Sequence, residues 1–146
     1  MAFNVRQIMS RSVISVGPET TLVAAAQLIR EHHFRHLPVV DRAHHVIGMV
    51  SQRDLVAAGI LGARSELVAP DDKRTVEAIM KRILHVVRPE DPVAKAGAMM
   101  LNNSYDSLPV VHAQRLVGIV TSSDFIRLVV ENADRFGAEV PLRWRD

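Results

Sequence analysis

Residues 118–124 read Gly-Ile-Val-Thr-Ser-Ser-Asp, and residues 48–54, 70 positions earlier, read Gly-Met-Val-Ser-Gln-Arg-Asp. In both stretches a branched apolar run ends at a hydroxyl residue, and an aspartate follows three positions later. A hydroxyl residue with an acidic residue at that spacing, ahead of an apolar segment, is typical of the first turn of a helix. The sequence therefore predicts a strand that runs directly into a helix, and it predicts this arrangement twice.

The repeat extends outward from these two stretches. Ile8-Met9 recurs as Ile79-Met80, Val16-Gly17-Pro18-Glu19 as Val87-Arg88-Pro89-Glu90, and Leu37-Pro38-Val39-Val40 as Leu108-Pro109-Val110-Val111, all displaced by 71 positions. Ordered self-similarity of this kind indicates a duplicated structural unit.

Each unit is predicted to have the order β-α-β-β-α. The apolar residues of the first helix recur at three and four positions and so share one face, whereas the hairpin strands are nearly continuous apolar runs. The predicted elements are a strand at 13–16 or 84–87, a helix at 21–33 or 92–103, strands at 36–40 and 46–50 or 108–111 and 116–120, and a closing helix after each hairpin.

We therefore expect an α+β fold in which two repeats pack sheet to sheet as a pseudo-twofold pair, because each sheet has an apolar face that it cannot bury alone. The expected divisions are residues 1–66 for the first repeat with the start of the linker, 67–136 for the second repeat, and 137–146 for a C-terminal tail. The tail holds the only tryptophan, and both docking and fraying remain open for it.

The composition argues against several classes of function. Lys and Arg number 18 against 16 Asp and Glu, a net charge of only +2, so nucleic acid is not an expected partner. Charges interrupt every apolar run, so no membrane segment is expected. The lack of cysteine removes disulfides and thiolate chemistry and suits a cytoplasmic location. None of the common nucleotide-hydrolysing, nucleophilic or metalloprotease motifs occurs, which predicts that the chain is not an enzyme.

A unit of this size with a Leu-Pro-Val-Val strand and a closing Gly-x-x-[Ser/Thr]-x-x-Asp resembles the CBS domain. Two such units in tandem resemble a Bateman module, and the resemblance covers about residues 4–62 and 74–136. It implies a regulatory homodimer that senses AMP, ADP or ATP between its repeats and signals to an effector protein, with the nucleotide as a regulatory ligand and no separate cofactor. S-adenosylmethionine or NAD in the same clefts is one alternative, and a ligand-free dimerisation or interaction module is another.

The resemblance also implies ligand-binding residues at matching positions. Asp54 and Asp124 are expected to bind the ribose hydroxyls, and the second repeat, whose closing motif is similar to the last repeat of the γ subunit of AMP-activated protein kinase, is expected to form the stronger site. The other expected ligand-binding residues are Ser51, Thr121 and Ser123 at the α-phosphate, Ile14, Ser15, His85 and Val86 at the adenine, Arg11, Arg82 and Arg53 near the phosphates, and His36 and Ser107 before the strand proline. Asp106, next to Ser107, favours a monophosphate over a triphosphate.

The residues alone leave a second interpretation open. Ser51 with Asp54, and Thr121 with Asp124, have the spacing of a plain capping box, which stabilises a helix by about 1 kcal/mol without any ligand. Backbone donors at such a helix start also suit a phosphate, so both interpretations use the same atoms.

Histidines raise a metal hypothesis, which we do not favour. His32, His33 and His36 are followed by His44 and His45, but the helix is expected to end by about His33, and no carboxylate lies in the matching turn. We therefore predict no metal site.

The second helices carry the apolar residues expected at a dimer interface, namely Leu55, Val56, Ile60, Phe125, Ile126 and Val129.

Overall fold

A computed structural model describes residues 2–82 and 85–137. The first helix of each repeat forms where the sequence predicts it, as α2 (Leu22–His32) and α4 (Val93–Asn103). The Thr21 hydroxyl accepts a hydrogen bond from the N–H of Ala24 at 3.1 Å and so caps α2. Both helices end at a residue in the left-handed conformation, His33 and Ser104, so the chain turns back at the same point in each repeat.

The two hairpins are confirmed, with the same register in both repeats. β1 (His36–Val40) pairs antiparallel with β2 (Val46–Ser51), and β4 (Ser107–His112) pairs with β5 (Arg115–Thr121). A register shift occurs at matching places, after Val39 in one hairpin and after Val110 in the other. The change in sequence displacement from 71 to 70 comes instead from the turn, where residues 41–45 separate Val40 from Val46 but only residues 112–115 separate Val111 from Leu116.

The predicted first strands are wrong in extent. Residues 13–16 form no strand, and Val16 makes a single parallel bridge to Val39. Val87 makes the equivalent bridge to Val110, and Leu84, where the second of these strands was predicted to begin, lies outside the described residues. Pro18 follows Val16 by two positions and has no N–H for a further rung, so the pairing stops.

Each hairpin runs into its second helix, α3 (Gln52–Ala57) or α5 (Ser122–Glu131). Of the residues predicted for a dimer interface, Leu55 and Ile60 are fully buried in the core of the first repeat, so that part of the prediction is wrong. Val56, Ile126 and Val129 remain exposed. The short helix η2 (Ala133–Phe136) follows α5, and the predicted tail lies almost wholly outside the described residues.

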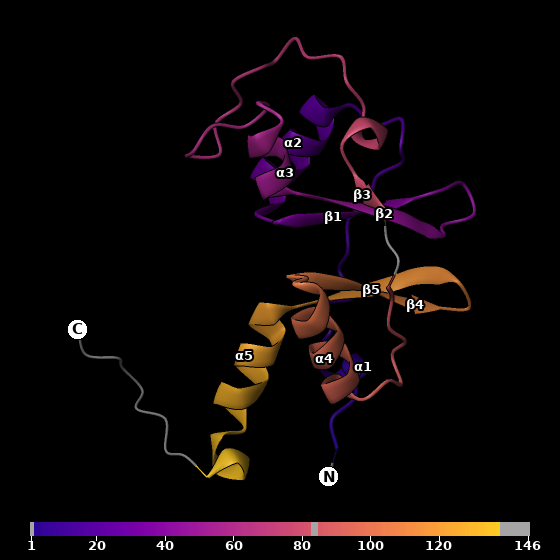
Figure 1. Ribbon diagram of the computed structural model, residues 1–146, viewed down its shortest axis with the longest axis vertical. Coiled ribbons are helices and arrows are strands. Elements are labelled where there is room, and N and C mark those ends of the chain that lie inside the picture. Colours follow the sequence, from indigo (N-terminus) through magenta and orange to yellow (C-terminus); the bar gives the residue numbers. More distant parts are fainter. Residues whose placement is uncertain (1, 83–84, 138–146) are drawn as a thin grey trace, which may run out of the picture.

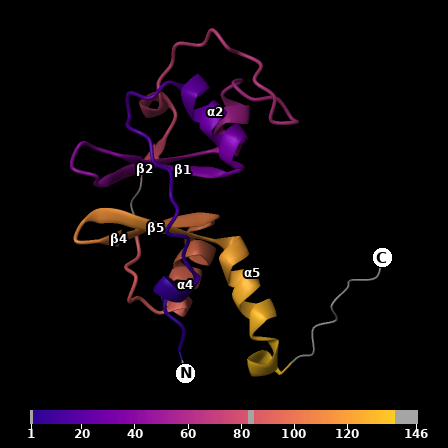
Figure 2. The same cartoon turned by 180° about the vertical axis from the view of Figure 1, so that it is seen from behind.

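The repeats exchange their N-terminal segments. The short helix α1 (Val5–Ile8) precedes the first repeat in sequence, yet it packs beside α4 in the lobe of the second repeat (Figures 1 and 2). The N–H of Val5 donates to the carbonyl of Asp91 at 2.9 Å. In the matching exchange η1 (Val76–Ala78) packs into the first lobe, where the N–H of Val76 donates to the carbonyl of Thr20 at 2.7 Å.

The exchange continues at the sheet edges. β3 (Lys81–Arg82) adds to β2 as a third strand, and Ser10 makes the corresponding bridge to Ile119 on β5. Two glycines allow this close approach, since a Cβ on Gly48 would lie 3.1 Å from the carbonyl oxygen of Lys81, and one on Gly118 would lie 2.8 Å from that of Ser10.

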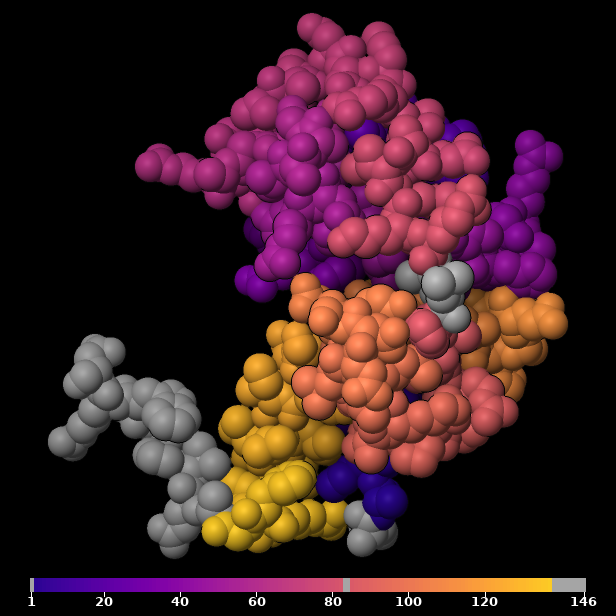
Figure 3. Space-filling view, in the orientation of Figure 1, coloured from indigo at the N-terminus to yellow at the C-terminus, as the bar shows by residue number. Residues whose placement is uncertain are grey.

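Two apolar cores result, and each contains residues of both repeats. The first includes Leu22, Leu37 and Val50 with Val76, and the second includes Leu108 and Val120 with Val5. The sheets face one another across the middle of the molecule, and the waist where the lobes meet is notched on one side (Figure 3). The predicted α+β pseudo-twofold pair is therefore confirmed, and the exchanged segments cross the boundary predicted between residues 66 and 67.

Candidate functional site

A cleft of about 890 Å³ lies at the waist and takes its lining from both lobes. Its walls come from the end of the first helix, the start of the hairpin and the junction with the second helix in each repeat. The pairs of matching positions that line it are His33 and Ser104, Phe34 and Tyr105, Arg35 and Asp106, His36 and Ser107, Ser51 and Thr121, Gln52 and Ser122, and Arg53 and Ser123. The cleft therefore lies on the pseudo-twofold axis, and its volume is that of a small-molecule site.

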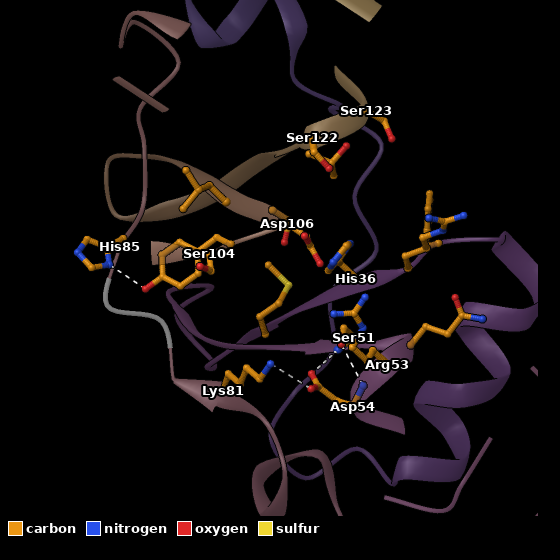
Figure 4. Close-up of a pocket in the computed structure, with 18 of the residues that line it drawn as sticks. His36, Ser51, Arg53, Asp54, Lys81, His85, Ser104, Asp106, Ser122 and Ser123 are labelled. Carbon is orange, nitrogen blue, oxygen red and sulfur yellow. Dashed lines mark hydrogen bonds and ion pairs between the residues drawn. The ribbon is translucent and has the colours of Figure 1, made fainter. Parts of the chain in front are cut away.

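Asp54 lies on the cleft surface at the start of α3. One carboxylate oxygen accepts a hydrogen bond from the N–H of Ser51 at 2.8 Å, and the other lies 3.4 Å from Nζ of Lys81 (Figure 4). The N–H of Asp54 donates in return to the hydroxyl of Ser51 at 3.0 Å. The capping box is thus present, and among the described residues only the exposed Lys81 pairs with the oxygen that does not serve the cap.

Asp124 occupies the equivalent position but is more buried and does not line the cleft. Its carboxylate accepts from the N–H of Thr121 at 2.7 Å, and the other oxygen accepts from the guanidinium of Arg127 at 3.1 Å. Arg127 does line the cleft and covers Asp124, whereas the matching residue in the first repeat is the small Ala57. The two aspartates are therefore not equivalent towards a ligand.

The centre of the cleft holds a histidine and a carboxylate from opposite lobes. His36 and Asp106 point toward one another in Figure 4. Burial lowers the pKa of His36, and the negative charges of Asp106 and Asp54 oppose that effect only in part. The imidazole is therefore neutral at pH 7, so one ring nitrogen donates a hydrogen bond and the other accepts one.

A second polar pair closes one end of the cleft. The hydroxyl of Tyr105 lies 2.9 Å from Nδ1 of His85, and the two rings are tilted at 52° with centroids 5.7 Å apart. Both side chains present aromatic surface beside a polar atom, which suits contact with a planar heterocycle.

Nine of the fourteen predicted ligand-binding residues line this cleft. They are His36, Ser51, Arg53, Asp54, Arg82, His85, Ser107, Thr121 and Ser123. The remaining five, Arg11, Ile14, Ser15, Val86 and Asp124, are not brought to it. Their ligand-binding roles stay predictions.

Sequence reasoning missed several cleft residues, chiefly Arg35 and Tyr105. Both directly precede the hairpin, and a comparison of the two repeats at the displacement of 71 would have drawn attention to that segment, because His36 and Ser107 had already been singled out there.

Within residues 2–82 and 85–137 no cluster of three or more histidine, aspartate or glutamate side chains has the arrangement of a metal site. Among those same residues no helix has both the length and the apolar character to cross a bilayer.

A family model described as CBS domain matches residues 5–60 and again residues 76–131. The chain therefore belongs to the CBS domain family, as a tandem pair. Hypoxic response protein 1 of Mycobacterium tuberculosis is 31% identical over 88% of this chain and 86% of its own length.

Solved structures agree with this assignment. The CBS domain pair of protein MJ0100, in complex with 5′-methylthioadenosine and S-adenosyl-L-methionine, has a TM-score of 0.75 and 29% identity, and the match covers 88% of this chain and 96% of that one. CBSX2 in complex with AMP has a TM-score of 0.76 and 26% identity, with coverage of 89% and 98%. The CBS pair predicted from the sequence repeat is thus confirmed.

Proposed function

We propose that this chain is a regulatory module that binds an adenine nucleotide in the axial cleft and passes its bound or free state to a partner protein, without catalysing a reaction. The observation that carries the proposal is the lining of the cleft, where Ser51 with Asp54, the hydroxyl residues that end β5 and begin α5, several cations and an aromatic pair surround a volume of about 890 Å³. Adenosine-containing ligands in the CBS pairs of MJ0100 and CBSX2 support it.

The geometry favours Asp54 as the ribose ligand. Its side chain is on the cleft, and Lys81, which is 75% exposed, is able to swing away and leave one oxygen for the ribose hydroxyls. Asp124 would first have to lose Arg127. The nucleotide acts here as a regulatory ligand and not as a cofactor, and a reducing cytoplasm belongs to the same proposal because the chain has no cysteine.

Calorimetric titration of AMP and ATP into wild type and Asp54→Ala tests this proposal. Loss of a charged acceptor from two hydrogen bonds is expected to weaken AMP binding at least tenfold. Asp124→Ala should weaken it less and should lower the melting temperature, because its buried carboxylate caps the start of α5 and pairs with Arg127. Asp71→Ala, at an exposed linker position outside the cleft, is the matched control and should bind like wild type.

A thermal-shift panel of AMP, ADP, ATP, S-adenosylmethionine and NAD then identifies the ligand, since a molecule that binds only the folded state raises stability. If none of the five binds wild type at millimolar concentration, the nucleotide proposal is rejected. If AMP binds wild type and Asp54→Ala equally, the ribose assignment is rejected and the capping box alone explains the motif.

We also propose a homodimer, on a second observation. α5 leaves Ile126, Val129 and Val130 exposed along one side, at 65%, 47% and 50% of their full accessible area. Apolar residues gathered in this way are typical of an interface, and closed twofold symmetry is the commonest way to cover one. Sedimentation should give about twice the chain mass of 16.2 kDa, and Ile126→Lys should reduce it to the monomer. A wild-type monomer at micromolar concentration would reject the dimer.

A further inference from the structure

The axial cleft is symmetric in shape but not in charge. Arg35 on the first lobe corresponds in sequence to Asp106 on the second, and Arg53 corresponds to Ser123. At the sheet edge, Lys81 pairs with β2 of the first lobe, whereas the residue in the same place on the second lobe is Ser10. At two matching positions of the lining, therefore, the first lobe presents a cation and the second presents a carboxylate or a hydroxyl, and the counterpart of the third cation, Lys81, does not line the cleft.

The two walls of the cleft differ accordingly. The wall on the first lobe carries four always-cationic side chains and one carboxylate, which are Arg35, Arg53, Lys81, Arg82 and Asp54. The opposite wall carries one cation and one carboxylate, Arg127 and Asp106, among hydroxyl groups from Ser104, Tyr105, Ser107, Thr121, Ser122 and Ser123.

Most of the cations on the first wall are available to a ligand. Within the described part of the chain Lys81 pairs with Asp54 and Arg127 pairs with Asp124, whereas Arg35, Arg53 and Arg82 form no ion pair. All three arginines are exposed to solvent. Guanidinium groups gathered on one side of a concave site raise the local potential there and bind phosphate oxygens bidentately.

We propose that the cleft binds a single anionic ligand in one orientation, with its phosphate groups on the first-lobe wall at Arg35 and Arg53. Two ligands related by the pseudo-twofold axis would place one set of phosphates beside Asp106, where like charges repel. This inference rests on the proposed function only in taking the ligand to be a nucleotide, because the charge difference between the walls applies to any phosphate compound.

The test uses three probes, AMP, adenosine and inorganic pyrophosphate, titrated calorimetrically into the full chain. Arg53→Ser places on the first lobe the residue that the second lobe has at the same position. It should weaken AMP and pyrophosphate at least fivefold and leave adenosine within twofold. Arg42→Ser, at an exposed position on the β1–β2 turn outside the cleft, makes the same change in net charge and should leave all three affinities unchanged. Melting curves establish that both variants fold.

Wild type is expected to bind one AMP per chain. Two equivalents of AMP with equal affinity, equal weakening of pyrophosphate by Arg53→Ser and Arg42→Ser, or equal weakening of adenosine and AMP by Arg53→Ser would each overturn the inference.

The outcomes also separate this inference from the proposed function. If pyrophosphate binds through Arg53 while AMP does not bind, phosphate binding on the first-lobe wall is supported and the nucleotide-binding function is rejected. If AMP binds wild type and Arg53→Ser with equal affinity, the nucleotide-binding function is supported and phosphate binding at Arg53 is rejected. Failure of all three probes to bind rejects both.

Discussion

The exchanged segments make a quantitative prediction about stability. Val5 and Val76 are fully buried, each in the core of the lobe that the rest of its own repeat does not form. Changing either to alanine removes two methyl groups, each contributing about 0.8 kcal/mol of burial, and leaves a cavity that relaxes only in part. We expect each change to lower the free energy of unfolding by about 2 to 3 kcal/mol, a large fraction of the 5 to 15 kcal/mol usual for a domain.

Urea unfolding followed by far-ultraviolet circular dichroism measures this loss, and thermal melting should give a midpoint about 5 to 10 °C lower. Val68→Ala is the control, because that side chain is 52% exposed and its change should stay within about 0.5 kcal/mol. Because Val5 and Val76 lie in different cores, their effects should add.

Hydrogen exchange then locates the effect. Val5→Ala should reduce amide protection in β4, β5 and α4 more than in β1, β2 and α2, although Val5 is closer in sequence to the latter group. Protection lost mainly from β1 and β2, or a change in unfolding free energy no larger than that of Val68→Ala, would refute the exchange of segments.

Three further predictions follow from the same contacts. Residues 1–66 expressed alone should show no cooperative melting transition, since Val76 is missing from their core and Val5 has no core to enter; a soluble and cooperatively folded fragment would contradict the shared cores. Gly118→Ala should destabilise the chain by about 1 to 3 kcal/mol in urea titration, because its Cβ would lie 2.8 Å from the carbonyl oxygen of Ser10, and an unchanged midpoint would show that this edge yields easily. Burial alone would raise the pKa of Asp91, but hydrogen bonds from the N–H of Arg88 and from Lys95, together with both positive charges, outweigh it and leave the pKa lowered. A carboxyl with a lowered folded pKa stabilises the fold above its unfolded pKa near 3.8 and loses that contribution as the pH falls below it, so unfolding free energy measured from pH 6 to pH 3 should fall more steeply in wild type than in Asp91→Asn.

Much of the fold was predictable because its signals are local. The Leu-Pro-Val-Val runs and the Ser/Thr-x-x-Asp junctions specify strands and helix starts within a few residues of themselves, and their repetition specifies two lobes. The lobe into which Ile8-Met9 and Ile79-Met80 pack was not predictable. A pattern of apolar residues indicates that a segment is buried, but it does not indicate in which of two similar cores.

The motif residues of the candidate site were predictable, but the difference between the two repeats was not. Sequence spacing makes Asp54 and Asp124 look alike, and both form the expected capping box. Their difference depends on a side chain one helical turn further on, Arg127 in one repeat and Ala57 in the other, and on whether it folds back over the carboxylate. Such a choice of rotamer follows from the assembled surroundings and not from the motif.

The exchange of segments also determines the order in which the two lobes are able to fold while the chain is synthesised on the ribosome. Val76 leaves the exit tunnel soon after the residues that it will cover, so the first lobe is able to close while synthesis continues. Val5 emerges first but has to wait for Val110 and Val120, more than a hundred residues later, which at 5 to 20 residues per second is a delay on the order of ten seconds. Throughout that delay the apolar side chain of Val5 has no core to enter, and anything fused ahead of α1 must leave it free to reach the second lobe.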